Sequence, residues 1–477
     1  MAGAIRRRLR FPSLSGVAWL CIVSVALGVF SLGHQAISQR RQARAVEWLQ
    51  KAGVRISAGS QPYWVPPVGS PRAVVGYDVR FPPSDEPLTP YEIECLLTLS
   101  GVRSLDLSHN LVDDELARKI AGIRSLEHLT LCRTGLTDGG LREVARLPAL
   151  RKLSIGATPT TPEVVKSVER EKNLPGLYEE WVRWKFWELT GKAAGVSSTG
   201  LDVTPKTVLR SVAYPLLAEL PDLRSLEIRQ TEPIAESLLR ELGEAGPFTS
   251  VRISGGVDRT NAAGLSGFQS AVEMTLQGPG IDDVMLQGAA GLPKLEKLSV
   301  VANELTGEGI GGLVGLPELR RLEIFALNGT TPPATGTIRL RLTPARWRTE
   351  LAKRAVAAGP AYEALADLPR LETVIIRNLP LNEVALRHLR QITTLRALVL
   401  SPSQLVTNEA VGELKTFGTH PRLEEFSLPT GLSRPQVIEV VEALRSAPAL
   451  KVIRVDRSNR QIAGQLDRSD GLRVQVY

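Results

Sequence analysis

Apolar residues recur along the chain in a short pattern, in which an apolar residue is followed by a second after three positions and a third after five. The pattern spans residues 102–107 and returns 24 residues later at 126–131. Its alternation of apolar and polar positions predicts a short strand with one buried face. The twelve copies begin at Val102, Leu126, Leu150, Leu223, Phe248, Ala271, Leu295, Leu319, Leu371, Leu395, Leu423 and Leu450. Because one such unit cannot bury its own apolar face, the repetition predicts a stack of units, a solenoid.

A second pattern follows several of these strands and predicts a helix. Residues 136–141, Leu-Thr-Asp-Gly-Gly-Leu, have counterparts at 281–286, 305–310, 381–386 and 406–411. In each copy an apolar residue is followed by a Thr, Asp or Asn, which is suited to cap the start of a helix. The first apolar residue of the helix comes after this capping position. Each unit is therefore predicted to contain a strand, a turn and a helix.

Two segments interrupt the repetition, at about residues 157–210 and 329–358. The chain returns from both in the same way, because residues 213–223 and 361–371 carry the same Ala-Tyr, Leu-Ala and Leu-Pro pairs at identical spacings. Insertions in repeat proteins often extend the face that binds a ligand. Residues 74–81 alternate like a strand that caps the open end of the first repeat.

These repeats resemble leucine-rich repeats, and the Leu-Thr-Asp-x-Gly-Leu helix starts resemble the ribonuclease-inhibitor-like class. The resemblance covers roughly residues 75–460 apart from the two insertions. It implies an α/β solenoid of units of about 24 residues, and it leaves the ligand unidentified. Residues 40–53, with the apolar segment before them, are also similar to bacterial single-pass membrane proteins that carry such repeats.

The N-terminal segment has the pattern of a membrane anchor. No Asp, Glu, Lys or Arg lies between Arg10 and Arg40, and residues 16–33 form a mostly apolar run. Eighteen helical residues rise about 27 Å, close to a hydrocarbon core of about 30 Å. We expect a basic flank at 1–15, a transmembrane anchor at 16–38, a juxtamembrane helix and linker at 39–74 and the repeat domain at 75–477. The alternative is a signal peptide that is cleaved near residues 36–38.

The charges around this segment predict its orientation. Arg6, Arg7, Arg8 and Arg10 precede the apolar run, and three further arginines follow it closely. The slight bias favours a cytoplasmic N-terminus. A single-pass membrane protein with an extracytoplasmic repeat domain is therefore expected.

The net charge of +8 comes from the N-terminal segment alone. Residues 1–55 hold nine of the 58 basic residues and one of the 50 acidic residues, which leaves 49 of each sign in residues 56–477. The repeats have no overall excess of positive charge, so a nucleic-acid partner is not expected.

The sequence has no pattern typical of catalysis, of a metal site or of a bound cofactor. Residues 307–312 are rich in glycine, as in a nucleotide-binding loop, but they lie in the register of a repeat helix start. Cys95 and Cys132 are predicted to lie on opposite sides of the solenoid and to stay unpaired. The five histidines are scattered, at His34, His109, His128, His388 and His420. We therefore expect a protein that is not an enzyme.

The period of two along each strand assigns the side chains to two faces. Residues beside the buried leucines point to the concave side of the solenoid, where a protein partner is expected to bind. The candidate contact residues are Asp106, His128, Thr130, Lys152, Glu227, Arg229, Arg252, Glu273, Lys297, Arg321, Glu323 and Arg377. Together they predict a broad polar surface of mixed charge. For each residue alone, an ordinary solvated position is the alternative.

The insertions carry a second set of candidates. The first insertion contains Trp181, Trp184, Phe186 and Trp187 among charged residues. Such a cluster is either a patch that binds a partner or stacks on a sugar, or the small core by which the insertion packs on the solenoid. The second insertion has a basic stretch within 339–354, suited to an anionic ligand or to a solvated helix face.

The sequence as a whole predicts a membrane-anchored scaffold that binds another protein without a cofactor. One alternative is an envelope module that binds glycans through the tryptophan cluster. The other is an enzyme whose site is built by the insertions.

Overall fold

The protein is described by a computed structural model over residues 16–58, 76–191, 195–197, 199–278, 280–302, 307–326, 359–378, 380–400, 404–405, 409–467 and 471–477. Within these ranges some side chains lie outside the description, including most of those in residues 16–36. The chain divides into two compact units, which we call unit 1 (Met1–Trp181) and unit 2 (Val182–Tyr477). The division falls inside the helix α6 (Leu177–Leu189).

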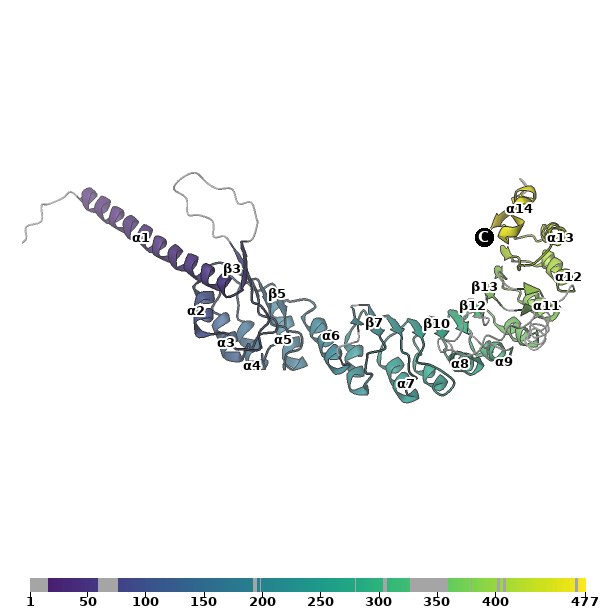
Figure 1. Cartoon of the computed structure of the whole chain (residues 1–477), viewed down its shortest axis with the longest axis horizontal. Helices are drawn as coiled ribbons and strands as arrows, with labels where there is room; N and C mark the ends of the chain where they lie inside the picture. The colour runs from purple at the N-terminus through teal and green to yellow at the C-terminus, as the bar shows by residue number, and fades with distance from the viewer. Residues whose placement is uncertain are drawn as a thin grey trace, which may run out of the picture. The chain divides into compact units, whose positions relative to one another are not determined.

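Unit 1 is a five-stranded sheet with helices on one side (Figure 1). The strands lie in chain order, with β1 antiparallel to β2 and the others parallel. They are β1 (Arg55–Ala58), β2 (Tyr77–Arg80), β3 (Val102–Asp106), β4 (His128–Thr130) and β5 (Lys152–Ser154). The helices are α1 (Gly16–Lys51), α2 (Pro90–Thr98), α3 (Asp114–Ile120), α4 (Asp138–Val144) and α5 (Pro162–Lys172). The capping strand predicted at 74–81 is confirmed as β2.

Unit 2 contains a twelve-stranded sheet that starts with the antiparallel hairpin β6–β7 and continues with parallel strands. Its strands are β6 (Gly195–Val196), β7 (Gly200–Val203), β8 (Ser225–Ile228), β9 (Ser250–Ser254), β10 (Glu273–Gly278), β11 (Lys297–Ala302), β12 (Arg321–Ala326), β13 (Thr373–Arg377), β15 (Ala397–Val399), β17 (Glu425–Ser427), β18 (Val452–Val455) and β19 (Arg473–Val476). A separate two-stranded sheet joins β14 (Pro380–Leu381) and β16 (Gln404–Leu405).

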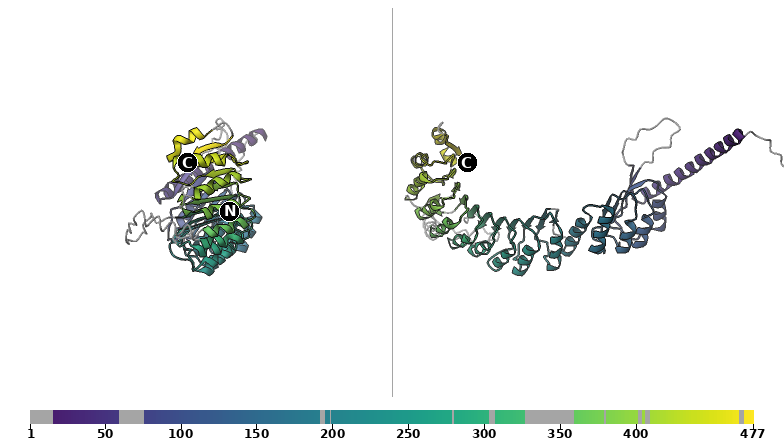
Figure 2. Two further views of the ribbon diagram at one scale, coloured as in Figure 1. Left: turned by 90° about the vertical axis from the view of Figure 1, so that its right-hand side faces the viewer. Right: turned by 180° about the vertical axis from the view of Figure 1, so that it is seen from behind.

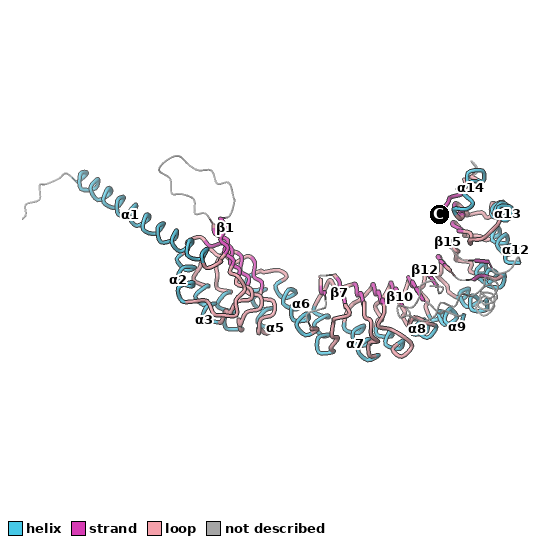
Figure 3. The backbone as a smooth tube through the Cα atoms, viewed as in Figure 1, coloured by secondary structure: helices cyan, strands magenta, loops and turns pink. Residues whose placement is uncertain are grey.

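In unit 2 the strands line the inner side of the curve of this unit, and the helices lie on its outer side (Figures 2 and 3). The α-helices are α7 (Glu236–Ala245), α8 (Asp283–Ala289), α9 (Gly307–Gly311), α11 (Glu383–Gln391), α12 (Glu409–Thr416), α13 (Arg434–Leu444) and α14 (Arg460–Leu466). The 3-10 helices are η1 (Ser211–Glu219), η2 (Ala262–Gly267), η3 (Gly312–Gly315), η4 (Gly359–Asp367), η5 (Phe417–Thr419) and η6 (Arg457–Asn459).

Every copy of the apolar pattern coincides with a strand, so the predicted solenoid of strand–turn–helix units is confirmed. The register is exact across neighbouring strands: Met274 faces Leu298, and Leu298 faces Leu322. These three side chains are at most 1% exposed. Burial of each apolar side chain contributes about 1.5–3 kcal/mol relative to exposure. The leucine columns therefore form the continuous core of each sheet.

The Leu-Thr-Asp-x-Gly-Leu pattern links one repeat to the next. The hydroxyl of Thr137 caps α4 by accepting a hydrogen bond from Gly139 N, and Thr137 itself donates from its backbone N–H to Asp114 of the preceding repeat at 2.9 Å. Thr161 and Asp138 repeat this contact one unit later at 2.8 Å. A side chain at Gly140 would place its Cβ only 2.4 Å from the Asp114 carboxylate. The glycine in the motif therefore makes room for the aspartate that holds the next cap.

The turns after the first strands are also repeated. His109, Arg133 and Ala157 all adopt a left-handed conformation with φ between 57° and 60°. The residue after each one is buried: the side chains of Thr134 and Thr158 donate to backbone carbonyls at 2.8 Å. These hydrogen bonds satisfy carbonyl groups that the tight turn would otherwise leave unpaired.

The two insertions affect the sheets differently. The sheet of unit 1 ends at β5, and a new sheet begins within the first insertion, where β7 already pairs in parallel with β8. Across the second insertion, β12 pairs directly with β13 in unbroken register. Both exits are similar, as predicted: Tyr214 in η1 and Tyr362 in η4 are buried at equivalent positions. The predicted second insertion, 329–358, lies outside the described residues.

The C-terminal part of α1 belongs to the fold of unit 1. Ala45 and Leu49 are buried, and Trp48 contacts Tyr91 of α2 edge-to-face at 4.7 Å between ring centroids. A helix was predicted in the segment 39–74, and α1 continues through it to Lys51. Among the helices of the described part, none is long and apolar enough to span a membrane.

Candidate functional site

The outward side of each sheet, opposite the helices, is the candidate binding surface, and we call it the strand face. Parallel strands in register place equivalent residues side by side, so outward side chains form columns across the repeats. In unit 2 one column runs through Glu273, Lys297 and Arg321. The register places these residues on the side away from the core, and their role as partner contacts stays a prediction.

The strand face of unit 1 consists mainly of short polar side chains. Ser104, His128 and Lys152 form one column, and Asp106, Thr130 and Ser154 form the next. Asp106 forms an ion pair with Arg80 at 3.1 Å. The exposed Lys152 has no ionic partner among the described residues.

Glu180 of α6 reaches the same face. Its carboxylate accepts a hydrogen bond from Ser154 Oγ at 3.2 Å and lies 4.0 Å from Cys132 Sγ. Burial, reinforced by the nearby Glu180 charge, raises the pKa of the Cys132 thiol to about 11. The thiol is therefore protonated at neutral pH and is a poor nucleophile. Cys95 and Cys132 are both free, as predicted.

The strand face of unit 2 carries charges that are largely paired between neighbouring strands. Arg229 contacts Asp202 and lies 4.0 Å from Glu227. The other pairs on this face are Lys297 with Glu273, Arg377 with Glu323 at 3.9 Å, and Arg454 with Glu425. Pairs this exposed contribute little to stability, about 0–1 kcal/mol each.

Two predicted contact residues of unit 2 remain without a partner. Arg252 on β9 and Arg321 on β12 are exposed, and neither forms an ion pair within the described part of the chain. From β9 to β13 the outward positions hold four cations and two carboxylates, and both carboxylates are already paired. The strand face of unit 2 therefore keeps local positive charge that the balanced composition of the repeats conceals.

Apolar side chains lie beside these charges, and the sequence interpretation missed them. Val301 on β11 faces Phe325 on β12, and Ile375 on β13 faces Val399 on β15. All four occupy outward positions; Ile375 is 5% exposed, and the other three are half-buried. The signal was present in the sequence as apolar residues at positions that alternate with the repeat leucines.

The residues that immediately precede the strands form a row of ion pairs across the repeats. The sequence interpretation missed this feature as well. Arg320 lies 4.0 Å from Glu296 and 3.3 Å from Glu372, which belong to the repeats on either side. Glu424 lies between Arg396 at 3.3 Å and Lys451 at 2.5 Å. The hydrogen bond from Lys451 lowers the pKa of Glu424. The sign of the charge at this position alternates from one repeat to the next, and this alternation was the signal in the sequence that could have predicted the ion pairs.

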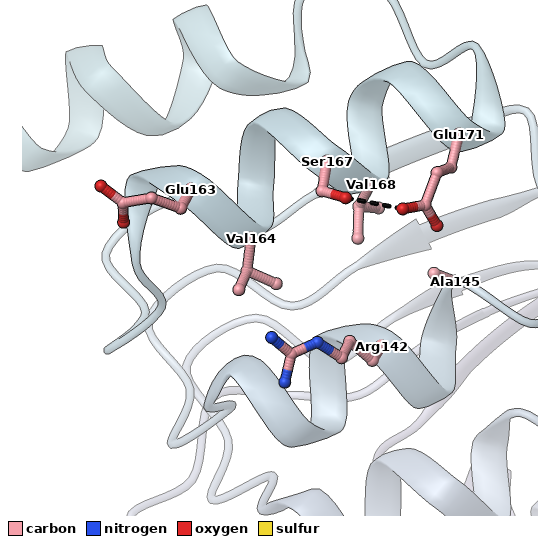
Figure 4. Close-up of a pocket in the computed structure, with 7 residues that line it drawn as sticks. All are labelled: Arg142, Ala145, Glu163, Val164, Ser167, Val168 and Glu171. Atoms are coloured by element: carbon pink, nitrogen blue, oxygen red, sulfur yellow. Dashed lines mark hydrogen bonds between the residues drawn. The ribbon is translucent and has the colours of Figure 1, made fainter.

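Two hollows of the described surface are open to solvent and have mixed polar and apolar linings. One, of about 600 Å³, lies at the hairpin β6–β7 and is lined by residues that include Ser225, Ser250 and Arg252. The other, of about 300 Å³, lies between α4 and α5, where Arg142 and Glu163 flank the apolar Val164 (Figure 4). In the second hollow Ser167 Oγ donates a hydrogen bond of 2.6 Å to the Glu171 carboxylate, and this hydrogen bond is exposed to solvent (Figure 4). No group of three or more metal-ligating side chains occurs among the described residues.

The aromatic cluster of the first insertion is divided between buried and exposed positions. Trp181 and Phe186 are 4% and 0% exposed, so they belong to the packing of α6. Trp184 and Trp187 are half-buried and pack edge-to-face at 5.2 Å. Only these last two rings remain available to a partner or a glycan, and that role stays a prediction. The basic stretch within 339–354 lies outside the described residues.

The register, the helix caps and the spacing define the fold as a leucine-rich-repeat solenoid. No protein-family model matches the chain, and no curated protein does either. Solved structures similar to it include an internalin (inlF) of Listeria monocytogenes, with 14% identity and a TM-score of 0.27 over 76% of this chain and 84% of that chain.

Two further similar structures are complexes, one of two proteins and one of a protein with RNA. A chain of the yeast Rad7–Elc1 complex has 14% identity and a TM-score of 0.28 over 97% of this chain and 98% of that chain. A chain of the TLR13–ssRNA13 complex has 14% identity and a TM-score of 0.31 over 75% of this chain and 57% of that chain. Similarity at this level does not bear on function, which has to be argued from the surface itself.

Proposed function

We propose that this protein is a non-catalytic scaffold that binds another protein on the strand face of unit 2. The observation that carries the proposal is the combination of unpaired guanidinium groups and half-buried apolar side chains on one exposed, preformed sheet. Because the sheet is held by its leucine core, little conformational entropy is lost when a partner binds. Aromatic and arginine side chains are also the types that contribute most to protein interfaces.

A photo-crosslinking amino acid placed on the two sides of unit 2, in neighbouring repeats, tests this proposal in cells. Ser299 on β11 lies on the strand face, and the exposed Gln287 on α8 lies on the helix side of the same unit. We expect an adduct of defined mass from position 299 and none from position 287. Adducts from position 287 alone, or from neither position, would contradict the proposal.

The proposal also includes the class of leucine-rich repeat to which these repeats belong. We infer that they belong to the ribonuclease-inhibitor-like class of leucine-rich repeats. The support is the helix that follows most strands and the Thr–Asp contact by which the helix starts of neighbouring repeats are joined.

We also propose that residues 16–38 tether the scaffold to a membrane and that the repeats lie outside the cytoplasm. The support is the uncharged run between Arg10 and Arg40 and the exposure of apolar residues on α1: Leu27, Val29 and Phe30 are 63%, 64% and 75% exposed. An isolated helix with such residues is expected to find an apolar environment.

Membrane fractionation combined with protease treatment of intact cells tests the tether. We expect the full-length chain in the membrane fraction and cleavage of the repeats from outside. A soluble chain that has lost its N-terminus would identify a cleaved signal instead. A membrane-bound chain that is protected until the membrane is broken would place the repeats in the cytoplasm.

A further inference from the structure

The apolar residues on the strand face of unit 2 form one continuous patch, which we call the β12 patch: Val301, Phe325, Ile375, Ala397 and Val399. The register places Val301 beside Phe325 and Ile375 beside Val399. Glu323 faces Ile375, so Phe325, two residues further along β12, is a diagonal neighbour of Ile375. Adjacent strands are about 4.8 Å apart, which lets these side chains form a single surface across four strands.

The patch differs from the core because it lies on the outward side. The inward residues of the same strands, Leu322, Ile324 and Val374, are all 0% exposed and already complete the core. Val301, Phe325 and Val399 retain accessible surface although they have no role in that core. A partly exposed apolar patch rimmed by charges is typical of an interaction site.

The charge next to the patch selects the kind of partner. Arg321 lies on β12, four residues before Phe325, and its column neighbours are Lys297 and Thr373. The two carboxylates on the outward side of β9–β13, Glu273 and Glu323, are paired with Lys297 and Arg377. Among the described residues Arg321 thus has no ionic partner, and a carboxylate is the best-matched ligand for its bidentate guanidinium group at the edge of the apolar surface.

We propose that the β12 patch binds an acidic segment of a partner protein, with a carboxylate on Arg321 and apolar side chains on Phe325 and Val399. The proposal rests on the protein-binding function proposed above and specifies the chemistry of the partner. Four residues along a strand span about 13 Å. An extended segment in which an Asp or Glu is separated by two to four residues from a large apolar residue therefore fits both features.

A random twelve-residue peptide library displayed on phage, selected on the full-length chain in detergent micelles, tests this proposal. We expect enrichment of peptides with Asp or Glu at that spacing from Phe, Leu, Ile or Trp. Synthetic versions of them should bind about tenfold or more weakly to Arg321→Glu and to Val399→Ser. Arg321→Lys should keep part of the affinity, because it keeps the charge and loses the bidentate geometry.

Arg252→Glu is the matched control, because Arg252 is also an exposed arginine on the same face with no ionic partner in the described part of the chain, three strands away from Arg321. This variant should leave binding unchanged, and circular dichroism should show that all variants fold. Selected peptides that are basic, that lack apolar residues, or that bind Arg321→Glu and Val399→Ser normally would overturn the proposal.

The outcomes also separate this proposal from the more general one. Peptides that lose binding on Arg252→Glu but not on Arg321→Glu would place the site elsewhere on the strand face, so the scaffold function would stand and the β12 patch would not. A library that yields no binder, or binders unaffected by any strand-face variant, would count against both proposals.

Discussion

In unit 1 the outward positions of β3, β4 and β5 hold Ser104, Thr130, Ser154 and similar short polar residues. In unit 2 the same positions hold arginines, paired carboxylates and the β12 patch. The inward positions of both units are leucines and other aliphatic residues at nearly complete burial. The comparison shows that the repeat fixes the inward positions, because they form the core, and leaves the outward positions free to differ. Among the described residues, apolar side chains gather beside unpaired arginines on the strand face of unit 2, whereas the strand face of unit 1 has polar side chains, among them His128 and Lys152.

The largest predicted effect tests whether the scaffold is the same in both units. Gly140→Ala in unit 1 and Gly309→Ala in unit 2 would each bring a Cβ within 2.4 Å of a carboxylate of the preceding repeat, that of Asp114 or Asp283. Each should destabilise the protein by about 1–3 kcal/mol, as overpacking does. Urea denaturation followed by circular dichroism measures the loss.

A third glycine provides the control. Gly412 lies in α12, and a Cβ at this position would have no atom within 4 Å. Gly412→Ala should therefore stabilise the protein by about 0.4–1 kcal/mol through reduced freedom of the unfolded chain. If all three substitutions change stability in the same direction, the explanation of the motif by close packing against the aspartate is wrong.

A second prediction concerns pH and is specific to unit 2. His420 is buried, its Nε2–H donates to the carbonyl of Ile392 at 3.0 Å, and burial lowers the pKa of its ring. The unfolded chain therefore binds a proton more readily than the folded chain, so stability should fall as the pH drops below about 6.5. The loss is limited to about 1.4 kcal/mol per pH unit, the contribution of one proton.

Denaturation midpoints measured between pH 7.5 and 5 test this effect. His420→Gln keeps a donor for Ile392 and should reduce the slope of stability against pH. His388→Gln, on the surface of α11, serves as the control and should leave the slope as it is in the parent. An unchanged slope in His420→Gln would show that other groups cause the acid sensitivity.

The smallest predicted effect compares the ion pairs of the two units. Arg103 binds Glu127 of unit 1 with two hydrogen bonds of 3.0 and 3.1 Å, and these lower the pKa of Glu127. Arg320 of unit 2 divides its contacts between Glu296 and Glu372. Both substitutions, Arg103→Ala and Arg320→Ala, should cost less than about 1 kcal/mol, with the larger cost for the bidentate pair.

Salt separates this electrostatic effect from a packing effect. The differences should shrink when sodium chloride is raised from 0.05 to about 1 M, because exposed charges are screened. Equal losses at low and high salt would mean that the arginine stems contribute by packing alone.

Much of the scaffold was predictable from the sequence, because each prediction depended on a local pattern. The strands from Val102 to Val455 follow from the apolar spacing, and the helix starts follow from caps such as Thr137. The free state of Cys95 and Cys132 follows from the two faces of the repeat. The break between the two sheets was not predictable, because nothing in residues 157–210 distinguishes a new sheet from an insertion into one.

The candidate site was predictable only in part, for a different reason. Alternation along a strand is enough to show that Arg252, Arg321 and Glu323 face outward. It cannot show which of these charges are neutralised, because each ion partner lies on a neighbouring strand. Arg320 and Glu372 are 52 residues apart in sequence, and only the unbroken pairing of β12 with β13 makes them neighbours.

The sequence by itself determined the repeating unit, its buried positions and its helix caps, since these depend on periods of two and 24 residues along one chain. The tertiary structure decided which outward residues lie side by side. It paired outward charges such as Glu273 and Glu323 with partners in adjacent repeats, and left Arg252 and Arg321 without an ionic partner among the described residues. It also made Phe325 a diagonal neighbour of Ile375. Stacking creates these neighbours across strands, so the surface that would bind a partner exists only once the solenoid has formed.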